Sequence, residues 1–299
     1  MSSKGSKLPQ TDPGAQRAIG VFDSGIGGLS VLQALRAEMP QERFIYWSDS
    51  AYAPYGERTD EFLIERCQFI TEQLIDKGNV KAVVVACNTA TAVAIESLRS
   101  KFPALPFIGV EPALKPALAL SQTGRVGVIG THSTLQSARF EKLLATVQAD
   151  ASPKTVDYVV QACRGLALAI EQQTEKSQAD HQEVERLCAH YLQQMGTFGT
   201  APDQIDTLVL GCTHYVFAQD ILQNMVGPGV QIISTGKAVA KQTQRLSADA
   251  SMALTAPALS APDAMQLWTT GSLEALAHAA DRWLGLPPSC CHFIAPSAT

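Results

Sequence analysis

The sequence predicts an α/β protein with two pseudo-symmetric lobes, each a mostly parallel sheet flanked by helices, and with its active site in the cleft between them. Short runs of Val, Ile and Leu alternate with amphipathic stretches, which is typical of strands that helices cover on both faces. The length of 299 residues fits about two domains. Two segments, 83–90 and 208–215, share one pattern of an apolar run followed by Cys and small polar residues. That repeat indicates two related halves.

Each strand is expected where an apolar run ends at a turn residue. The expected strands are residues 19–22, 44–47, 82–86, 107–110, 126–129, 156–160, 207–210, 232–233 and 267–270. Helical spacing of apolar residues predicts helices that include residues 29–37, 62–77, 90–99, 135–145, 181–194 and a last one ending at 283. Residues 247–262 are rich in Ala, Ser and Pro and are expected to form a long loop.

A second internal sequence similarity supports duplication, because residues 19–24 resemble residues 126–131. Residues 1–17 are polar, rich in Gly, Ser, Pro and Gln, and lack an apolar signal core, so a disordered extension is expected. The expected division of the chain is the extension 1–17, a first lobe of 18–111 plus 226–285, a second lobe of 112–225, and a tail of 286–299.

Composition excludes several classes of protein. The net charge of −5 leaves no basic surface for nucleic acid. No apolar run approaches the roughly 18 residues of a membrane helix, so no membrane partner is expected. Seven cysteines without a framework spacing favour a reducing, cytoplasmic location. No Cys-x-x-Cys pair is present, which argues against zinc.

The two repeated segments place Cys87 and Cys212 just beyond the carboxyl ends of strands, where ligands bind in open α/β sheets. Polar residues that begin helices follow each thiol, and a helix amino terminus is expected to lower a thiol pKa. His214 lies two residues after Cys212, where it can tune that thiol or carry its proton. The alternative is that each Cys is an inert core residue. The other cysteines are expected to be structural or incidental; they are Cys67, Cys163, Cys188, Cys290 and Cys291.

Two turns carry further candidates. Residues 22–30 form a glycine-rich turn, but Ser30 replaces the third glycine of a dinucleotide fingerprint and Asp23 would repel a pyrophosphate. One interpretation is that Asp23 or Ser24 merely caps the next helix. The other is that Asp23 meets a cation or orients a base, while Ser24 and nearby amides hold a carboxylate. Residues 49–58 form either an ordinary turn or one in which Tyr55 and the Gly56 amide meet a ligand carboxylate.

Five motifs in order resemble those of the glutamate racemases, in the cofactor-independent aspartate/glutamate racemase superfamily. They lie at residues 20–29, 49–58, 86–90, 128–131 and 211–215, and the resemblance extends from about residue 19 to 285. It implies catalysis by Cys87 and Cys212 without cofactor or metal. It also implies substrate contacts at Asp23, Ser24, Tyr55, Gly56, Asn88, Thr89, Thr213 and His214. Glu171 matches a supporting glutamate, although Arg164 stands where the family often has Pro.

The resemblance implies interconversion of L- and D-glutamate for peptidoglycan synthesis by two-base proton transfer. The resemblance implies that Cys87, assisted by Asp23, exchanges a proton with the D-enantiomer. Cys212, assisted by His214, exchanges one with the L-enantiomer. A homodimer and activation by a cell-wall precursor are compatible with this reading. The alternatives are an aspartate racemase or a related cofactor-independent decarboxylase, and a non-catalytic protein that binds an acidic ligand.

Overall fold

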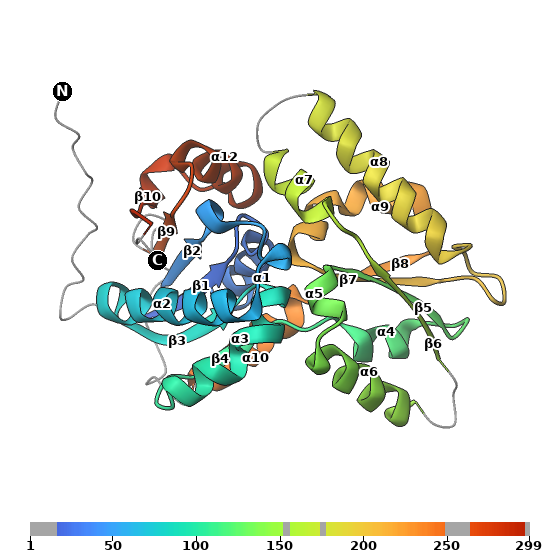
Figure 1. The fold of residues 1–299 in the computed structure, drawn as a ribbon, viewed down its shortest axis with the longest axis horizontal. Helices are drawn as coiled ribbons and strands as arrows, with labels where there is room; N and C mark the ends of the chain where they lie inside the picture. The colour runs from blue at the N-terminus through green and yellow to red at the C-terminus, as the bar shows by residue number, and fades with distance from the viewer. Residues whose placement is uncertain (1–16, 152–155, 174–177, 249–263, 297–299) are drawn as a thin grey trace.

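The computed structural model describes residues 17–151, 156–173, 178–248 and 264–296. Figure 1 shows two lobes side by side, each built on its own sheet, and confirms the expected α/β class. The expected extension lies outside the described residues except for Arg17, and so does the expected 247–262 loop beyond residue 248. Within the described ranges, no helix is both long enough and apolar enough to cross a membrane.

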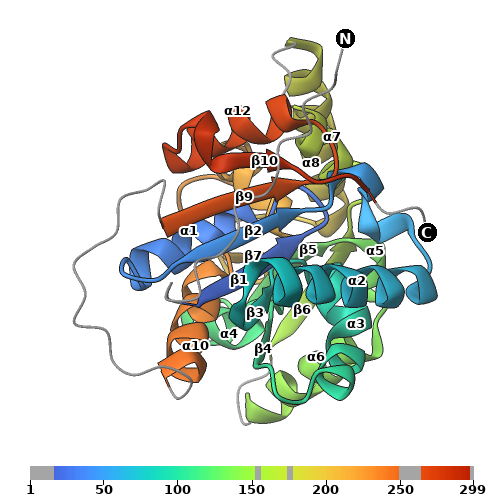
Figure 2. The same ribbon diagram turned by 90° about the vertical axis from the view of Figure 1, so that its left-hand side faces the viewer.

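The first lobe contains a six-stranded parallel sheet in the order β10-β9-β2-β1-β3-β4. Its strands are β1 (Ala18–Asp23), β2 (Phe44–Ser48), β3 (Val80–Val85), β4 (Phe107–Gly109), β9 (Met265–Thr269) and β10 (Cys291–Phe293). Alternating side chains of these strands enter two cores, one on each face. One face packs on α1 (Leu29–Glu38), α10 (Gly236–Ala248) and α12 (Leu273–Leu284), and the other on α2 (Asp60–Gly78) and α3 (Asn88–Lys101) (Figure 2).

The second lobe contains a four-stranded parallel sheet in the order β6-β5-β7-β8. Its strands are β5 (Arg125–Gly130), β6 (Asp157–Ala162), β7 (Thr207–Gly211) and β8 (Gln231–Ile233). One face packs on α7 (Leu166–Gln172), α8 (Gln178–Met195) and α9 (Gln219–Val226). The other packs on α4 (Leu114–Leu120), α5 (His132–Leu135) and α6 (Ala138–Asp150).

The two sheets share one internal order, because β2-β1-β3-β4 corresponds to β6-β5-β7-β8. β1 therefore corresponds to β5, and β3 to β7. This correspondence explains why residues 19–24 resemble 126–131 and why residues 83–90 resemble 208–215. The carboxyl ends of parallel strands share one edge of a sheet, so the equivalent strands present equivalent residues at the cleft.

Several expected boundaries need correction. The expected first lobe included residues 226–285, yet β8 pairs with β7 in the second sheet, and the chain returns to the first lobe only at α10. The expected tail 286–299 contains β10, which pairs with β9. The helix expected over 135–145 begins at residue 138, because the Ser137 hydroxyl accepts a bond from Phe140 N at 3.1 Å and starts a new helix there.

Candidate active site

A cavity of about 50 Å³ lies between the lobes, at the carboxyl ends of strands from both sheets. Every sequence-predicted site residue lines it except Asp23, which lies fully buried beside it. The cavity therefore unites residues that are far apart in the sequence. Its lining is Ser24, Ala53, Pro54, Tyr55, Gly56, Glu57, Cys87, Asn88, Thr89, Thr131, His132, Cys163, Arg164, Gly165, Ala167, Leu168, Glu171, Cys212, Thr213 and His214.

Cys87 caps the amino terminus of α3, and its Sγ accepts a bond from Ala90 N at 3.5 Å. Its thiol also donates to the Asp23 carboxylate. Burial raises the pKa of Cys87 well above its usual value, and the negative charge of Asp23 adds to that effect. The expectation that the helix terminus would give Cys87 a lowered pKa is therefore wrong, because the Ala90 amide acts in that direction but burial outweighs it.

Asp23 ends β1 and joins the glycine-rich turn to both lobes. Its Oδ1 accepts from Ser24 N at 2.8 Å, while Oδ2 accepts from Gly28 N at 2.5 Å and from Thr213 Oγ1 of the second lobe at 3.2 Å. Burial raises the pKa of Asp23, although His214 and Cys87 act to lower it. Asp23 binds the Gly28 amide at the start of α1, but among the described residues no side chain caps that helix, and its role toward the thiol stays a prediction.

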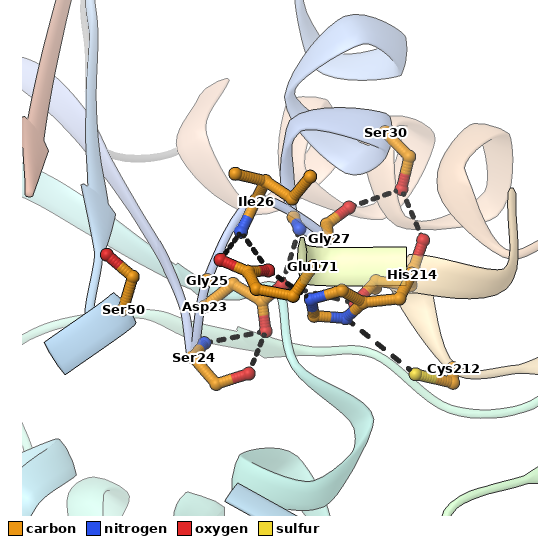
Figure 3. A network of polar contacts seen from close by, with 12 residues as sticks. Asp23, Ser24, Gly25, Ile26, Gly27, Ser30, Ser50, Glu171, Cys212 and His214 are labelled. Atoms are coloured by element: carbon orange, nitrogen blue, oxygen red, sulfur yellow. Dashed lines mark hydrogen bonds and ion pairs between the residues drawn. The ribbon is translucent and has the colours of Figure 1, made fainter. Parts of the chain in front are cut away.

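The second thiol has a different neighbour. Cys212 follows β7 and precedes a 3-10 turn, η3 (Thr213–Ala218), rather than the expected α-helix. Its Sγ lies 3.9 Å from His214 Nδ1, and His214 Nε2 lies 2.7 Å from Glu171 Oε2 (Figure 3). Burial alone would lower the pKa of His214, but its hydrogen bonds with Cys212 and Glu171 raise it well above the usual value.

Glu171 reaches this pair from α7 and is fixed by the first lobe. Its Oε2 accepts from Ile26 N at 2.9 Å. Two glycines of the turn make room for the contact, because a Cβ on Gly25 would lie 2.2 Å from Glu171 Oε2 and one on Gly27 would lie 2.3 Å from His214 Nδ1. The glycine-rich turn therefore serves close side-chain approach, as Figure 3 shows.

Neutral polar groups complete the cavity. Thr89 Oγ1 lies 3.0 Å from Thr131 Oγ1 and 3.4 Å from Thr134 Oγ1, which joins the two lobes through hydroxyls. Asn88 Nδ2 donates to Val110 O at 3.4 Å, whereas Asn88 Oδ1 is buried without a partner among the described residues. These groups can receive both charged ends of a small polar ligand.

Tyr55 lines the cavity, but its hydroxyl is engaged elsewhere. It donates to Asp49 Oδ2 at 2.5 Å, and Asp49 also accepts from Arg66 at 2.6 and 2.7 Å and from Thr270 Oγ1 at 3.1 Å. Both members of the Arg66–Asp49 ion pair are buried. This buried cluster holds the segment of residues 53–57 from the core side, while Ser133 Oγ of the second lobe donates to Gly56 O at 2.8 Å from the cleft side.

Ten of the twenty lining residues were absent from the predicted set, and three of them are Thr131, Cys163 and Arg164. Thr131 follows β5 and caps α5, and its correspondence to Ser24 in the similar segments 19–24 and 126–131 was the signal for it. Cys163 follows β6 and was expected to be structural or incidental, yet it lies on the cavity wall. Arg164 comes next, at the position where the family often has Pro, and also lines the cavity. Within the described ranges, no group of three His, Cys, Asp or Glu side chains could hold a metal ion.

Comparison with known proteins agrees with this geometry. The profile of the Asp/Glu/Hydantoin racemase family matches residues 29–243. The glutamate racemase of Ectopseudomonas mendocina is 42% identical over 260 residues, which make up 87% of this chain and 92% of that protein. The glutamate racemase of Pseudomonas aeruginosa is 44% identical over 237 residues, or 79% of this chain and 84% of that protein.

Two solved structures extend the likeness to the fold. Glutamate racemase isoform RacE1 of Bacillus anthracis superposes with a TM-score of 0.77 at 29% identity, covering 94% of this chain and 98% of that one. The Escherichia coli glutamate racemase, solved with L-glutamate and the activator UDP-MurNAc-ala, gives 0.74 at 28% identity, covering 94% and 99%. The chain therefore belongs to the Asp/Glu/hydantoin racemase family, within which it groups with the glutamate racemases.

Proposed function

We propose that this protein interconverts L- and D-glutamate, with Cys87 and Cys212 as the two groups that exchange protons with the α-carbon. One observation carries the proposal. The two thiols come from equivalent strands of two related sheets and line the same cavity. A base on each face of the α-carbon is what inversion of configuration by proton transfer requires. The family membership supports the same reaction.

The charges around the thiols suggest their resting states. The raised pKa of Cys87, due first to burial and then to Asp23, keeps this thiol protonated near neutral pH. His214 remains an imidazolium because its bonds to Cys212 and Glu171 overcome the effect of burial. A positive ring 3.9 Å from Cys212 Sγ attracts negative charge to that sulfur. Cys212 is then ready to remove the proton of L-glutamate, and Cys87 is ready to deliver one.

The reverse direction needs the opposite proton distribution. Asp23 accepts from the Cys87 thiol and has a raised pKa from burial, so it is suited to take the Cys87 proton. His214 can correspondingly return a proton to Cys212. The two auxiliary groups thus let the pair of thiols exchange roles between turnovers.

Substrate binding follows from the neutral groups. The buried Oδ1 of Asn88 can accept from the substrate ammonium. Hydroxyls of Ser24, Thr89, Thr131 and Thr213 can donate to its carboxylates. Hydrogen bonds to the α-carboxylate strengthen as negative charge moves onto it in the transition state. This arrangement replaces the electron sink that a cofactor would supply.

We place the reaction in the supply of D-glutamate for peptidoglycan and in the reducing cytoplasm, where free thiols persist. All seven cysteines are free in the structure, in keeping with such a location. UDP-MurNAc-ala activates the E. coli relative, so adding it to the assay tests whether this chain shares that response. Sedimentation with and without it tests the expected homodimer.

The decisive experiment follows the circular dichroism of L-glutamate incubated with the full-length protein in D₂O. We expect the signal to fall to zero, early product to carry α-deuterium, and the remaining substrate to carry little. Activity should survive dialysis against a chelator without added cofactor. Cys87→Ala and Cys212→Ala should each lower the rate by at least about a thousandfold, whereas the control Cys188→Ala, in the core of the second lobe, should not.

The alternatives give distinct results. Racemisation of L-aspartate at a higher kcat/KM than L-glutamate would make this an aspartate racemase. Binding of glutamate without α-deuterium exchange would make it a non-catalytic binding protein. Full activity in either Ala variant, or activity that requires pyridoxal phosphate or a metal, would overturn the two-thiol mechanism.

A further inference from the structure

Arg164 has the one permanently charged cationic side chain among the residues that line the cavity. The other ionisable lining residues, apart from the cysteines and Tyr55, are Glu57, Glu171 and two histidines, and Asp23 lies directly behind. Glutamate carries two carboxylates and one ammonium at neutral pH. A net negative substrate must therefore enter a cavity whose fixed charges are largely negative, which calls for a compensating cation.

The backbone around Arg164 is anchored, while its side chain has no carboxylate partner. Arg164 O accepts from Tyr191 Oη at 2.7 Å, and the neighbouring Cys163 N donates to Gly130 O at 2.9 Å. The side chain is exposed and forms no ion pair within the described part of the chain. By contrast, Arg66, Arg125 and Arg186 all pair with carboxylates. The guanidinium of Arg164 is thus available to a ligand.

We propose that Arg164 is the residue that draws the dicarboxylate substrate into the cavity and pairs with one of its carboxylates there. A guanidinium matches a carboxylate with two parallel N–H donors. At an exposed edge its field also reaches beyond contact distance, and salt screens it. This inference rests on the proposed glutamate racemisation, but it concerns substrate capture and not proton transfer.

The test compares Arg164→Gln with Arg186→Gln in the full-length protein. Arg186 lies on α8 of the same lobe, is exposed, pairs with Glu183 and does not line the cavity, so its variant removes the same charge elsewhere. We expect Arg164→Gln to raise KM for both enantiomers about three- to tenfold, with kcat within about twofold. Arg164→Lys should recover part of the loss, because it keeps the charge without the paired donors.

Ionic strength supplies a readout that a purely structural role would not move. Between about 0.01 M and 0.15 M salt the Debye length falls from about 30 Å to about 8 Å. The kcat/KM of the parent protein and of Arg186→Gln should fall over this range, and that of Arg164→Gln should fall much less. Parental KM and salt dependence in Arg164→Gln, or equal changes in Arg186→Gln, would overturn the role of Arg164.

Titration calorimetry with L-glutamate keeps this inference separate from the proposed function. If the parent protein binds glutamate without racemising it, the proposed function fails, and weaker binding by Arg164→Gln still supports the role of Arg164. If racemisation proceeds and Arg164→Gln binds as the parent does, only the role of Arg164 fails. Absence of glutamate binding by the parent protein overturns both.

Discussion

The two lobes repeat one scaffold but give their thiols different partners. β3 and β7 occupy equivalent places in the two sheets, and each is followed by a cysteine at the cavity. Beside Cys87 lies a buried carboxyl, Asp23, whereas beside Cys212 lies an imidazole held by Glu171. Duplication thus accounts for a thiol from each lobe at the cavity, and under the proposed mechanism the side chains that break the symmetry determine which thiol starts as acid and which as base.

A second contrast lies one strand away in each sheet. After β2, Asp49 is buried and bound by Arg66, Tyr55 and Thr270. After β6, at the equivalent place, stand Cys163 and the exposed Arg164. The first lobe therefore presents a wall fixed by its core, and the second presents a cation to solvent. The first lobe thus positions residues 53–57 at the cavity, and Arg164, proposed above to capture the substrate, comes from the second lobe.

Replacing either thiol by an alcohol should have the largest effect on activity and should distinguish the two lobes. Cys87→Ser and Cys212→Ser should each lower kcat/KM by about a thousandfold or more, since serine is a far weaker base. The two enantiomers have equal free energy, so the loss in kcat/KM is the same in both directions. The substrate isotope effect separates the two sides. With α-deuterated substrate, Cys212→Ser should show a large effect from L-glutamate and a small one from D-glutamate, and Cys87→Ser the reverse.

An isotope effect on the same enantiomer in both Ser variants would contradict the assignment of one thiol to each face.

Replacing Asp23 or His214, the two auxiliary groups, should lower activity less than replacing a thiol does. His214→Asn and Asp23→Asn should each lower kcat/KM by about a hundredfold, because the thiols remain but lose their proton partners. The isotope effect should increase on L-glutamate in the His214 variant and on D-glutamate in the Asp23 variant. His132→Asn, at another lining histidine, serves as the control and should change little. Identical isotope patterns in the two variants would show that the lobes are equivalent.

The pH dependence should reflect the imidazole of the second lobe. Despite burial, the Cys212 and Glu171 bonds raise the folded-state pKa of His214 above its usual 6.5. Its contribution to stability is therefore fully present below pH 6.5 and is lost as pH rises through the raised pKa. Activity should follow a bell-shaped profile with its alkaline limb in the same range. Chemical unfolding and kcat/KM measured across pH in the parent and His214→Asn test this, and an unchanged alkaline limb in the variant would exclude His214.

The smallest effect on activity should come from Tyr55, which helps to hold residues 53–57 of the first lobe. Tyr55→Phe removes a buried hydrogen bond to the charged Asp49 and should lower the free energy of unfolding by about 1.5–3 kcal/mol. KM should rise several-fold as residues 53–57 loosen, while kcat stays near the parental value. Tyr158→Phe, which removes a half-buried bond to Leu114 O in the second lobe, should cost less and leave KM unchanged. Equal effects of both variants would show that Tyr55 has no positioning role.

Strands and thiols were predictable because both are local. Buried parallel strands read as continuous apolar runs, and each catalytic candidate follows such a run directly. The contact of Glu171 with His214 was not predictable from spacing, since it depends on how α7 of one lobe meets the turn at Ile26 of the other. Burial also reversed the expected pKa shift of Cys87, and no local pattern reports how deeply a thiol will lie. The short β8 and β10 were assigned to the wrong parts because three-residue strands take their partners from tertiary packing.

The volume of the cavity has a consequence for how substrate enters the site and product leaves it. One water needs roughly 10–15 Å³ of such space, so the 50 Å³ cavity holds about four waters, which an entering glutamate has to displace. Two sets of bonds join the lobes around this space, the hydroxyl contacts at Thr89 and Gly56 and the carboxylate contacts of Glu171 and Asp23, and any separation of the lobes for substrate entry breaks one set. Charge-assisted bonds are the stronger set, so we expect the hydroxyl contacts to separate first. Opening of the hydroxyl contacts alone would let the small molecules exchange while Asp23 and Glu171 keep their bonds across the lobes.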